Sequence, residues 1–265
     1  MSRSNLFLAL RQGVGSRKVL EKAGDGEILE SIQKILQRRP AYGYRRVTSR
    51  LRRKAQKDAL PPINHKRVYR IMRRNGLVLS APPQKQKRAH TGKVQTLLSN
   101  TRWCSDGFCI QCANGDRVHV AFSLDSCDRE VMRYIASTIG IDGQMIRDLM
   151  VETMEYRLGT LRSPRSIQWL SDNGPCYTAR ETVQLGRALG LDVRTTPSYS
   201  PESNGMAEAF VKTFKRDYVQ FGDLEDAETV MAQLPAWMED YNEQAPHKGL
   251  NMLSPREFLR NRMAG

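Results

Sequence analysis

The sequence has no stretch of apolar residues long enough to cross a membrane. A transmembrane helix needs about 20 consecutive, mostly apolar residues, and no run in these 265 residues approaches that length. The N-terminus also lacks the apolar core and the small-residue cleavage site of a secretory signal peptide. We therefore expect a soluble protein that remains in the cytoplasm.

Cysteine is scarce as well. The five cysteines are odd in number and show no repeating spacing, which argues against a disulfide framework. Cys109 and Cys112, with His119 nearby, suggest a zinc site as an alternative, but their spacing places the two thiols on opposite faces of a strand-like stretch. We interpret the cysteines as small, buried hydrophobic residues.

Acidic residues are few in the N-terminal part of the chain. Residues 1–100 contain 24 Lys and Arg against 5 Asp and Glu, a net charge of +19, whereas residues 101–265 carry a net charge of −5. The overall net charge is +14 and the pI is about 9.8. Such a basic block is either a solvated surface or a binding surface for a polyanion or an anionic membrane. A carboxylate site suited to phosphodiesters, described below, favours nucleic acid.

The basic region is predicted to begin with a loosely ordered arm at residues 1–25 and to continue as three short helices. Apolar residues recur at helical spacing in 27–37 and 45–54, and Asn64 is a suitable N-cap for a third helix. Residues 26–79 thus indicate an all-α helix-turn-helix or winged-helix module that binds DNA, although a merely basic surface helix is the alternative. The candidate phosphate contacts are Lys66, Arg67, Arg70, Arg73 and Arg74.

A second unit follows a predicted basic linker at residues 80–100. The hydrophobic period there changes to two, the period of a half-buried strand, and Asn114-Gly115 is a hairpin signal. Residues 101–221 predict a mixed α/β sheet, and residues 222–265 a C-terminal helical extension. The expected strands are 103–112, 118–124, 131–137, 167–170 and 191–195, and the expected helices are 142–158 and 178–189.

Three acidic residues occupy positions that suit a divalent-metal site. Asp106 lies within the first strand, Asp172 follows the fourth, and Glu208 opens a helix after a loop. Hard cations such as Mg²⁺ prefer oxygen ligands, and a pair of them about 3.5–4 Å apart supports phosphodiester chemistry. Each acid alone could be a cap or a surface residue. Asp125 and Glu202 are rival candidates, but Glu202 falls within the loop.

The helix that carries Glu208 also carries Lys212 and Lys215, four and seven positions later and on the same face. Cations beside a carboxylate cluster would hold the phosphates of the DNA that is cut. The alternative is that both are ordinary solvated lysines.

The order and spacing of several motifs resemble the DDE transposases of bacterial insertion sequences, of the type encoded in a second reading frame. The catalytic core of that family is similar to retroviral integrase and ribonuclease H. The resemblance covers about residues 42–262. The motifs are Gly43-Tyr44-Arg45-Arg46, Asn64-His65-Lys66-Arg67-Val68-Tyr69-Arg70 with Gly76-Leu77, Arg102-Trp103-Cys104-Ser105-Asp106, Ser171-Asp172-Asn173-Gly174, Ser200-Pro201-Glu202-Ser203-Asn204-Gly205-Met206-Ala207-Glu208, Tyr241-Asn242, Pro246-His247, Leu250 and Ser254-Pro255.

The resemblance implies a ribonuclease H-like core, with a five-stranded mixed sheet and flanking helices, in which Asp106, Asp172 and Glu208 are catalytic metal ligands. It implies phosphoryl transfer without a covalent enzyme intermediate: water cuts DNA at the element end, and the 3′-hydroxyl then attacks a target phosphodiester. Two Mg²⁺ ions, with Mn²⁺ as a substitute, are the implied cofactors. The implied partners are double-stranded DNA, further copies of the chain and an upstream-frame fusion or partner protein, at the nucleoid.

Two other functions stay open at this point, a non-catalytic DNA-binding regulator or assembly partner and a plain nuclease of the ribonuclease H kind. The chain also departs from the family pattern. Gly107-Phe108 replaces a β-branched residue and Thr after the first Asp, and Ala245 replaces an Arg before Pro246-His247. The family often has a Lys at position 215 and an acidic residue two positions later, here Asp217. His247 could orient DNA or make a structural hydrogen bond.

Overall fold

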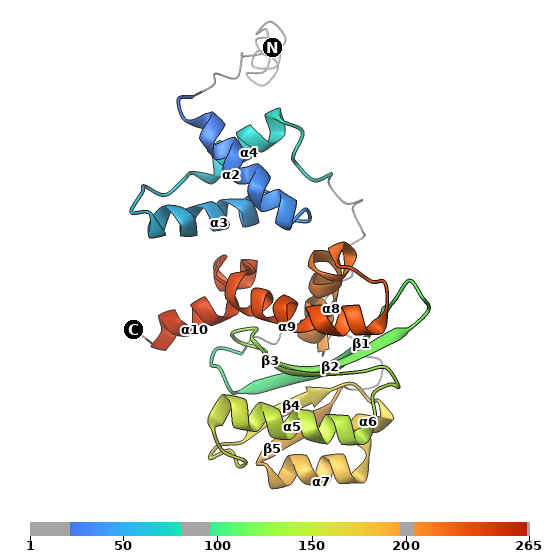
Figure 1. Ribbon diagram of the computed structural model, residues 1–265. Coiled ribbons are helices and arrows are strands. Elements are labelled where there is room, and N and C mark those ends of the chain that lie inside the picture. Colours follow the sequence, from blue (N-terminus) through green and yellow to red (C-terminus); the bar gives the residue numbers. More distant parts are fainter. Residues whose placement is uncertain (1–21, 81–95, 197–203, 264–265) are drawn as a thin grey trace, which may run out of the picture.

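The computed structural model describes residues 22–80, 96–196 and 204–263 (Figure 1). The predicted N-terminal arm, most of the predicted linker and most of the loop before Glu208 lie outside these residues. Within the described ranges, no helix is both long and apolar enough to cross a membrane.

The N-terminal module consists of three helices: α2 (Asp25–Arg38), α3 (Tyr44–Lys57) and α4 (His65–Arg74). Their inner faces form a separate hydrophobic core around Ile32, Val47 and Met72. The predicted cap of the third helix is confirmed, because the side chain of Asn64 accepts a hydrogen bond from the backbone N–H of Lys66 at 2.8 Å. That bond satisfies one of the donors that a helix start leaves open.

The second unit is built on a five-stranded sheet in the order β3-β2-β1-β4-β5. The strands are β1 (Arg102–Gln111), β2 (Arg117–Asp125), β3 (Val131–Ser137), β4 (Ile167–Ser171) and β5 (Leu191–Thr195). β2 pairs antiparallel with β1 and β3, whereas β4 pairs parallel with β1 and β5. The predicted hairpin turn is present, and Gly115 there has φ +95°, a conformation that glycine adopts readily.

Helices cover both faces of the sheet (Figure 1). On one face lie α5 (Gly143–Leu158), α6 (Pro175–Thr178) and α7 (Arg180–Ala188). On the other lie α8 (Gly205–Asp217) and α9 (Ala227–Gln244), and α10 (Pro255–Met263) ends the described chain. The short 3-10 helices η2 (Val219–Phe221) and η3 (Lys248–Leu250) precede α9 and α10, respectively. The two faces bury separate hydrophobic clusters. The predicted fold class is confirmed: a mixed sheet with flanking helices, preceded in the chain by a small all-α module.

One predicted helix begins later than expected. The expected helix 178–189 corresponds to α7, whereas Thr178 ends the short helix α6, and Ala179 between them has an extended backbone with φ −52° and ψ 135°. Pro175 stands at the start of α6, where its missing N–H costs no helical hydrogen bond. The hydroxyl of Thr182 donates to the carbonyl of Cys176 at 3.0 Å and links the two helices across the break.

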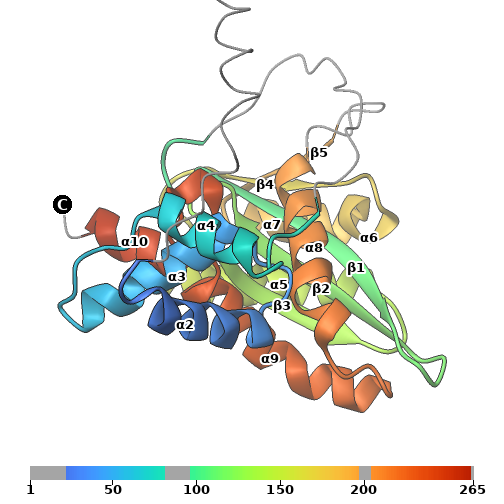
Figure 2. The same ribbon diagram turned by 90° about the horizontal axis from the view of Figure 1, so that it is seen from above.

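The N-terminal module lies against the C-terminal helices in both overall views (Figures 1 and 2). Ion pairs join arginines of the module to acids of α8, α9 and α10. They are Arg46 with Asp217 at 2.6 Å, Arg39 with Asp240 at 2.5 Å and Arg53 with Glu257 at 2.6 Å. The basic module is thus attached to the acidic part of the chain through charge.

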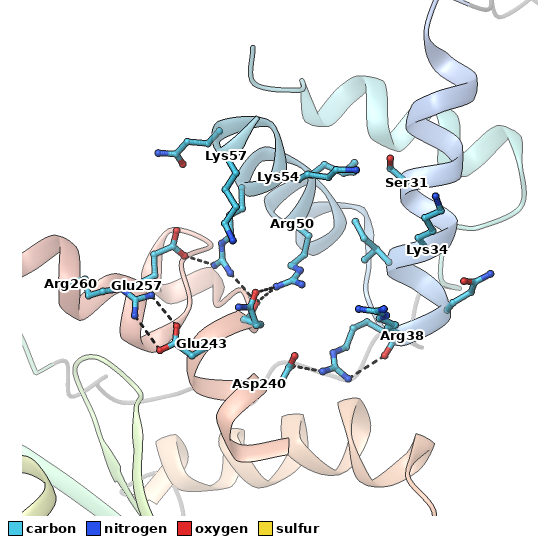
Figure 3. Close-up of a pocket in the computed structure, with 17 residues that line it drawn as sticks. Ser31, Lys34, Arg38, Arg50, Lys54, Lys57, Asp240, Glu243, Glu257 and Arg260 are labelled. Carbon is cyan, nitrogen blue, oxygen red and sulfur yellow. Dashed lines mark hydrogen bonds and ion pairs between the residues drawn. The ribbon is translucent and has the colours of Figure 1, made fainter. Parts of the chain in front are cut away.

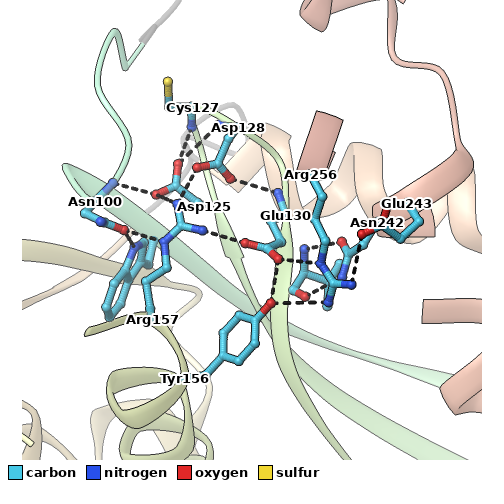
Figure 4. A network of polar contacts seen from close by, with 12 residues as sticks. Asn100, Asp125, Cys127, Asp128, Glu130, Tyr156, Arg157, Asn242, Glu243 and Arg256 are labelled. Carbon is cyan, nitrogen blue, oxygen red and sulfur yellow. Dashed lines mark hydrogen bonds and ion pairs between the residues drawn. The ribbon is translucent and has the colours of Figure 1, made fainter. Parts of the chain in front are cut away.

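A buried polar network joins α5 to the turn between β2 and β3 (Figure 4). The guanidinium of Arg157 forms ion pairs with Asp125, Asp128 and Glu130, all of which are buried. Arg256 of α10 contacts the same Glu130 at 2.9 Å. Because a buried charge needs partners, this network fixes three elements relative to one another.

Candidate active site

Asp106 and Asp172 come from neighbouring parallel strands. Cys104 of β1 pairs with Leu170 of β4. Asp106 stands two residues further along β1, and Asp172 stands two residues beyond Leu170, directly after Ser171, the last residue of β4. Residues two apart share a face, and adjacent strands are about 4.8 Å apart. The two acids therefore lie close to each other beside this pair of strands, and the charge of Asp172 raises the pKa of Asp106.

Glu208 reaches this face from α8, which lies beside β1 in both views (Figures 1 and 2). Phe210 of α8 packs against Phe108 of β1 with ring centroids 6.4 Å apart, in the cluster that also contains Cys104 and Ala207. Glu208 is exposed in the first turn of this helix. The structure thus places all three predicted acids on one side of the sheet.

The carboxylate of Asp106 is half-buried and electrostatically strained. Burial raises its pKa to about 6; the hydrogen bond from the backbone N–H of Gly107, at 2.8 Å, lowers it, and the negative charges of Asp172 and Glu208 raise it. The exposed Asp172 accepts a hydrogen bond from the backbone N–H of Gly174 at 2.9 Å. Each of these two carboxylates is therefore held by a neighbouring main-chain donor.

The donor set suits a hard divalent cation. All the donors are carboxylate oxygens, and no Lys or Arg of the described residues forms an ion pair with any of the three acids. The side chains do not yet enclose a site, however. Among the described residues, no three Asp, Glu, His or Cys side chains, these three included, stand close enough to hold one ion as they are. Joint ligation requires the side chains or α8 to move inward.

The rival acids do not share this position. Asp125 lies at the far end of β2, fully buried, and accepts hydrogen bonds from the backbone N–H groups of Asn100 and Cys127, both at 2.7 Å. It also faces Arg157 and belongs to the structural network described above. Glu202 lies outside the described residues.

The two predicted phosphate-binding lysines of α8 are exposed. The ammonium nitrogen of Lys215 lies 5.7 Å from the ring centroid of Phe108, two residues along β1 from Asp106. Lys212 lies one turn from Glu208 on the same helix. Asp217, the acid two positions after Lys215, is buried and paired with Arg46 and Arg216, so it connects domains rather than lining the site.

The predicted DNA-contact residues of α4 fall into two groups. Lys66, Arg73 and Arg74 are exposed. Arg67 and Arg70, in contrast, bind the carboxylate of Asp25 at 2.8 and 2.6 Å. Both of these arginines therefore hold α4 against the start of α2, a role that the sequence analysis did not identify.

Tyr177 is a residue of the site region that the sequence analysis missed. It lies in α6, five positions after Asp172, and is buried. The hydroxyl of Ser105, the neighbour of Asp106, donates to the Tyr177 hydroxyl at 3.2 Å. This hydrogen bond joins the segment after β4 to β1 next to the two acids. In the sequence, the feature that could have indicated a buried role for Tyr177 is its position as a large aromatic residue close to a polar turn.

Both departures from the family pattern have packing consequences. A Cβ atom on Gly107 would lie 2.4 Å from Cδ1 of Ile141, so a β-branched side chain does not fit there without a shift. Phe108 instead packs among Phe122, Phe210 and other aromatic rings. Ala245 is fully buried, where an arginine side chain has no space in the present packing.

His247 is half-buried and contacts the Tyr241 ring, with centroids 4.9 Å apart. Its backbone N–H donates to the carbonyl of Leu253 at 3.0 Å, whereas its ring nitrogen Nε2 is buried with no hydrogen-bond partner among the described residues. Burial, together with nearby arginines such as Arg129, lowers its pKa to about 3. The imidazole is therefore neutral and belongs to the packing of the C-terminal helices.

Family models match most of the described chain. An HTH-like domain matches residues 24–86, and two models described as integrase core domain match residues 98–201 and 189–255. The transposase InsD for insertion element IS2A/D/F/H/I/K of Escherichia coli is 48% identical over 240 residues, which cover 90% of this chain and 80% of that protein. The transposase InsD for insertion element IS2-9 of E. coli strain K12 is also 48% identical over 240 residues, with 90% and 78% covered.

The fold is similar to that of a chain in the cryo-EM structure of the simian T-cell lymphotropic virus intasome in complex with the PP2A regulatory subunit B56 gamma. The sequence identity is 16% and the TM-score is 0.53, with 86% of this chain and 73% of that chain covered. At this identity the likeness concerns the fold alone.

Proposed function

Because the chain belongs to the DDE transposases of insertion sequences, we propose that Asp106, Asp172 and Glu208 are the carboxylates with which it cuts DNA at the element ends and joins those ends to a target. The proposal is supported above all by the position of Asp106 on β1 and of Asp172 directly after the parallel partner strand β4. Glu208 faces the same side from α8, and its charge contributes to the raised pKa of Asp106. The family is one of transposases, so a non-catalytic regulator is not favoured.

The proposed cofactors are two divalent cations, Mg²⁺ or its substitute Mn²⁺. When bound, such ions supply activation of the attacking oxygen and neutralisation of the charge that develops on the phosphate. The residues that would hold them are Asp106, Asp172 and Glu208, whose oxygens lack a cationic partner among the described residues. The mutual repulsion of the three acids provides a reason for that site to take up positive charge.

The chain's own residues prepare the reaction by position and charge. The backbone N–H groups of Gly107 and Gly174 each hold one oxygen of the adjacent carboxylate. Lys215 and Lys212 would bind the phosphates that flank the cleaved bond, since both are exposed on the helix that presents Glu208. In-line attack on a phosphodiester depends mainly on such positioning and on electrostatic stabilisation.

The proposed partner is double-stranded DNA, both the element ends and the target. The HTH-like module implies DNA binding, and we assign phosphate contacts to Lys66, Arg73 and Arg74 of α4. Arg67 and Arg70 would contribute only if they left Asp25. Since two element ends must be joined together, we further propose a homo-oligomer on DNA, aided by an upstream-frame fusion or partner protein, in the cytoplasm and at the nucleoid.

A coupled cleavage and joining assay on element ends tests the proposal. Asp172→Asn should reduce both products by about a thousandfold or more in Mg²⁺ or Mn²⁺, because it removes a ligand needed in the transition state. Asp148→Asn is the matched control, since Asp148 is an exposed acid on α5 at the opposite face of the sheet. Unchanged joining by Asp172→Asn would reject the assignment, and cleavage without joining would indicate a nuclease instead.

A further inference from the structure

A groove of about 910 Å³ lies between the N-terminal module and the C-terminal helices (Figure 3). Residues of α2 and α3 form one side, and residues of α9 and α10 form the other. It is separate from the carboxylate site, which lies above β1, and from α4, none of whose residues line it. The groove is lined neither by the three proposed metal-binding carboxylates nor by the predicted DNA-contact residues of α4.

The groove is strongly basic, although three acids take part in it. Eight of its residues are Lys or Arg, whereas the acids are Asp240, Glu243 and Glu257. Each of these acids already has an arginine partner: Arg39 for Asp240, Arg53 for Glu257, and Arg260 for Glu243. The acidic side is therefore neutralised within the protein, and the excess charge belongs to the helices of the module.

That excess consists of Arg50 and of four exposed cations with no side-chain partner among the described residues. Lys34 and Arg38 are one turn apart on α2, and Lys54 and Lys57 are one turn apart on α3. Residues three or four apart on a helix are about 4.5–6 Å apart along its axis. Each helix thus presents a short row of positive charge to the same groove, as Figure 3 shows.

Beneath these rows, two further arginines contribute donors to the groove. Arg53 donates to the main-chain carbonyl of Gln244 at 3.0 Å, and Arg50 contacts the side-chain oxygen of the same residue. Both are only partly exposed. Hydrogen bonds from Arg50 and Arg53 therefore hold α3, which carries one of the two rows of cations, against the end of α9.

We propose that this groove binds the phosphate backbone of a DNA duplex, as a contact surface separate from α4. The assignment rests on the proposed function, which makes DNA the substrate. A duplex strand presents a regular line of negative charge, which complements two rows of unpaired cations better than a compact anion would. The contact carries no base recognition, because lysine and arginine rows of this kind bind phosphates without reading sequence.

Binding of the full chain to a 30-base-pair duplex of unrelated sequence tests the proposal. The variant Lys34→Gln, Arg38→Gln, Lys54→Gln, Lys57→Gln should bind about tenfold more weakly, with a slope of log affinity against log salt that is smaller by about 2 to 4. The matched variant Arg162→Gln, Arg165→Gln, Arg180→Gln, Arg187→Gln removes the same charge from exposed positions around α7. It should keep the wild-type slope.

Equal slopes for the groove variant and the wild type would overturn the proposal, as would an equal loss in both variants, which indicates net charge alone. A change of oligomeric state in the groove variant with an unchanged slope would also overturn it, in favour of a second copy as occupant. Asp172→Asn should keep the wild-type slope of log affinity against log salt. Failure of the proposed catalytic function and failure of the proposed groove contact are therefore distinguished, the first by the joining assay and the second by the salt dependence of binding.

A second measurement uses the wild-type protein and needs no variant to fold. Acetylation of lysines, followed by mass spectrometry, should show Lys34, Lys54 and Lys57 protected by the duplex at low salt and released at high salt. Exposed Lys248 of η3 lies outside the groove lining and provides the reference. Protection of the three groove lysines no greater than that of Lys248 would contradict the proposal.

Discussion

Asp106 on β1 and Asp172, directly after the parallel strand β4, each stand two residues beyond the paired Cys104 and Leu170. The arrangement follows from the fold, because the parallel pairing of β1 with β4 brings the segment that holds Asp106 beside the segment that holds Asp172. Two carboxylates fixed in this way repel each other, and burial of Asp106 adds to the cost of its charge. A cation that binds between them would reduce both the repulsion between the two carboxylates and the cost of burying the charge of Asp106.

Asp106→Asn should therefore have opposite effects on thermal stability with and without metal. In EDTA near neutral pH, the variant should unfold at a higher temperature than the wild type, since a repelled, half-buried charge is removed. With Mn²⁺ at about 100 times its dissociation constant, the wild type should gain about 2.7 kcal/mol and the variant little. Thermal unfolding followed by circular dichroism checks this, and an equal gain in both proteins would contradict it.

Arg157→Gln should destabilise the protein by about 3–5 kcal/mol, because it leaves Asp125, Asp128 and Glu130 buried without their shared cation (Figure 4). Arg194→Gln breaks an exposed pair with Asp192 and should cost no more than about 1 kcal/mol. Urea unfolding at neutral pH measures both. A cost for Arg157→Gln as small as that of the exposed pair would show that water reaches the network.

His247 should make the protein less stable in acid. Its folded pKa is lowered to about 3 by burial and nearby arginines, whereas an unfolded imidazole titrates near about 6.5. The unfolded chain thus takes up a proton first, so the contribution to stability is complete above pH 6.5 and is lost as the pH falls toward 3, by up to about 1.4 kcal/mol per pH unit.

Comparison of variants isolates this contribution from carboxylates that titrate in the same range. In urea unfolding across that pH window, His247→Gln should show a shallower loss than the wild type. His65→Gln, at an exposed position, should follow the wild-type curve. Parallel curves for all three proteins would mean that the His247 imidazole accepts its proton while the chain stays folded.

Gly107→Val should destabilise the chain by about 1 kcal/mol, because its Cβ would meet the terminal Cδ1 of Ile141 at 2.4 Å and force that half-buried side chain into another rotamer. Ile141→Ala in the same chain should recover most of that loss, giving a favourable coupling energy in a double-mutant cycle. Urea unfolding of the four proteins provides the cycle. If the losses of unfolding free energy in the two single variants simply add up in the double variant, the contact between residues 107 and 141 is not the cause of the destabilisation.

Much of the fold follows from local sequence patterns. Strict alternation in β2 and the turn at Asn114-Gly115 gave a strand and hairpin that the structure contains. Asp142 and Asn64 cap their helices as expected, with hydrogen bonds of 2.8 Å each to Met145 and Lys66. These features depend on neighbours in the sequence, so their signals are read directly from it.

Other features depend on contacts between distant segments. Arg67 and Arg70 have the appearance of free DNA contacts until α2 brings Asp25 to them, and Asp217 of α8 pairs with Arg46 of α3. The distance of Glu208 from the other two acids depends likewise on how α8 docks. No residue pattern encodes such docking, and for that reason the sequence predicts three acids as metal ligands but not the separation between them.

The position of bound Mn²⁺ tests the central claim most directly. Anomalous diffraction from crystals of the protein with an element-end duplex and Mn²⁺ should show one or two peaks, at about 2.0–2.2 Å from oxygens of Asp106, Asp172 and Glu208 together. That result requires the three side chains to approach more closely than in the structure described here. Peaks that contact Asp106 and Asp172 but not Glu208, or that lie elsewhere, would contradict the assignment.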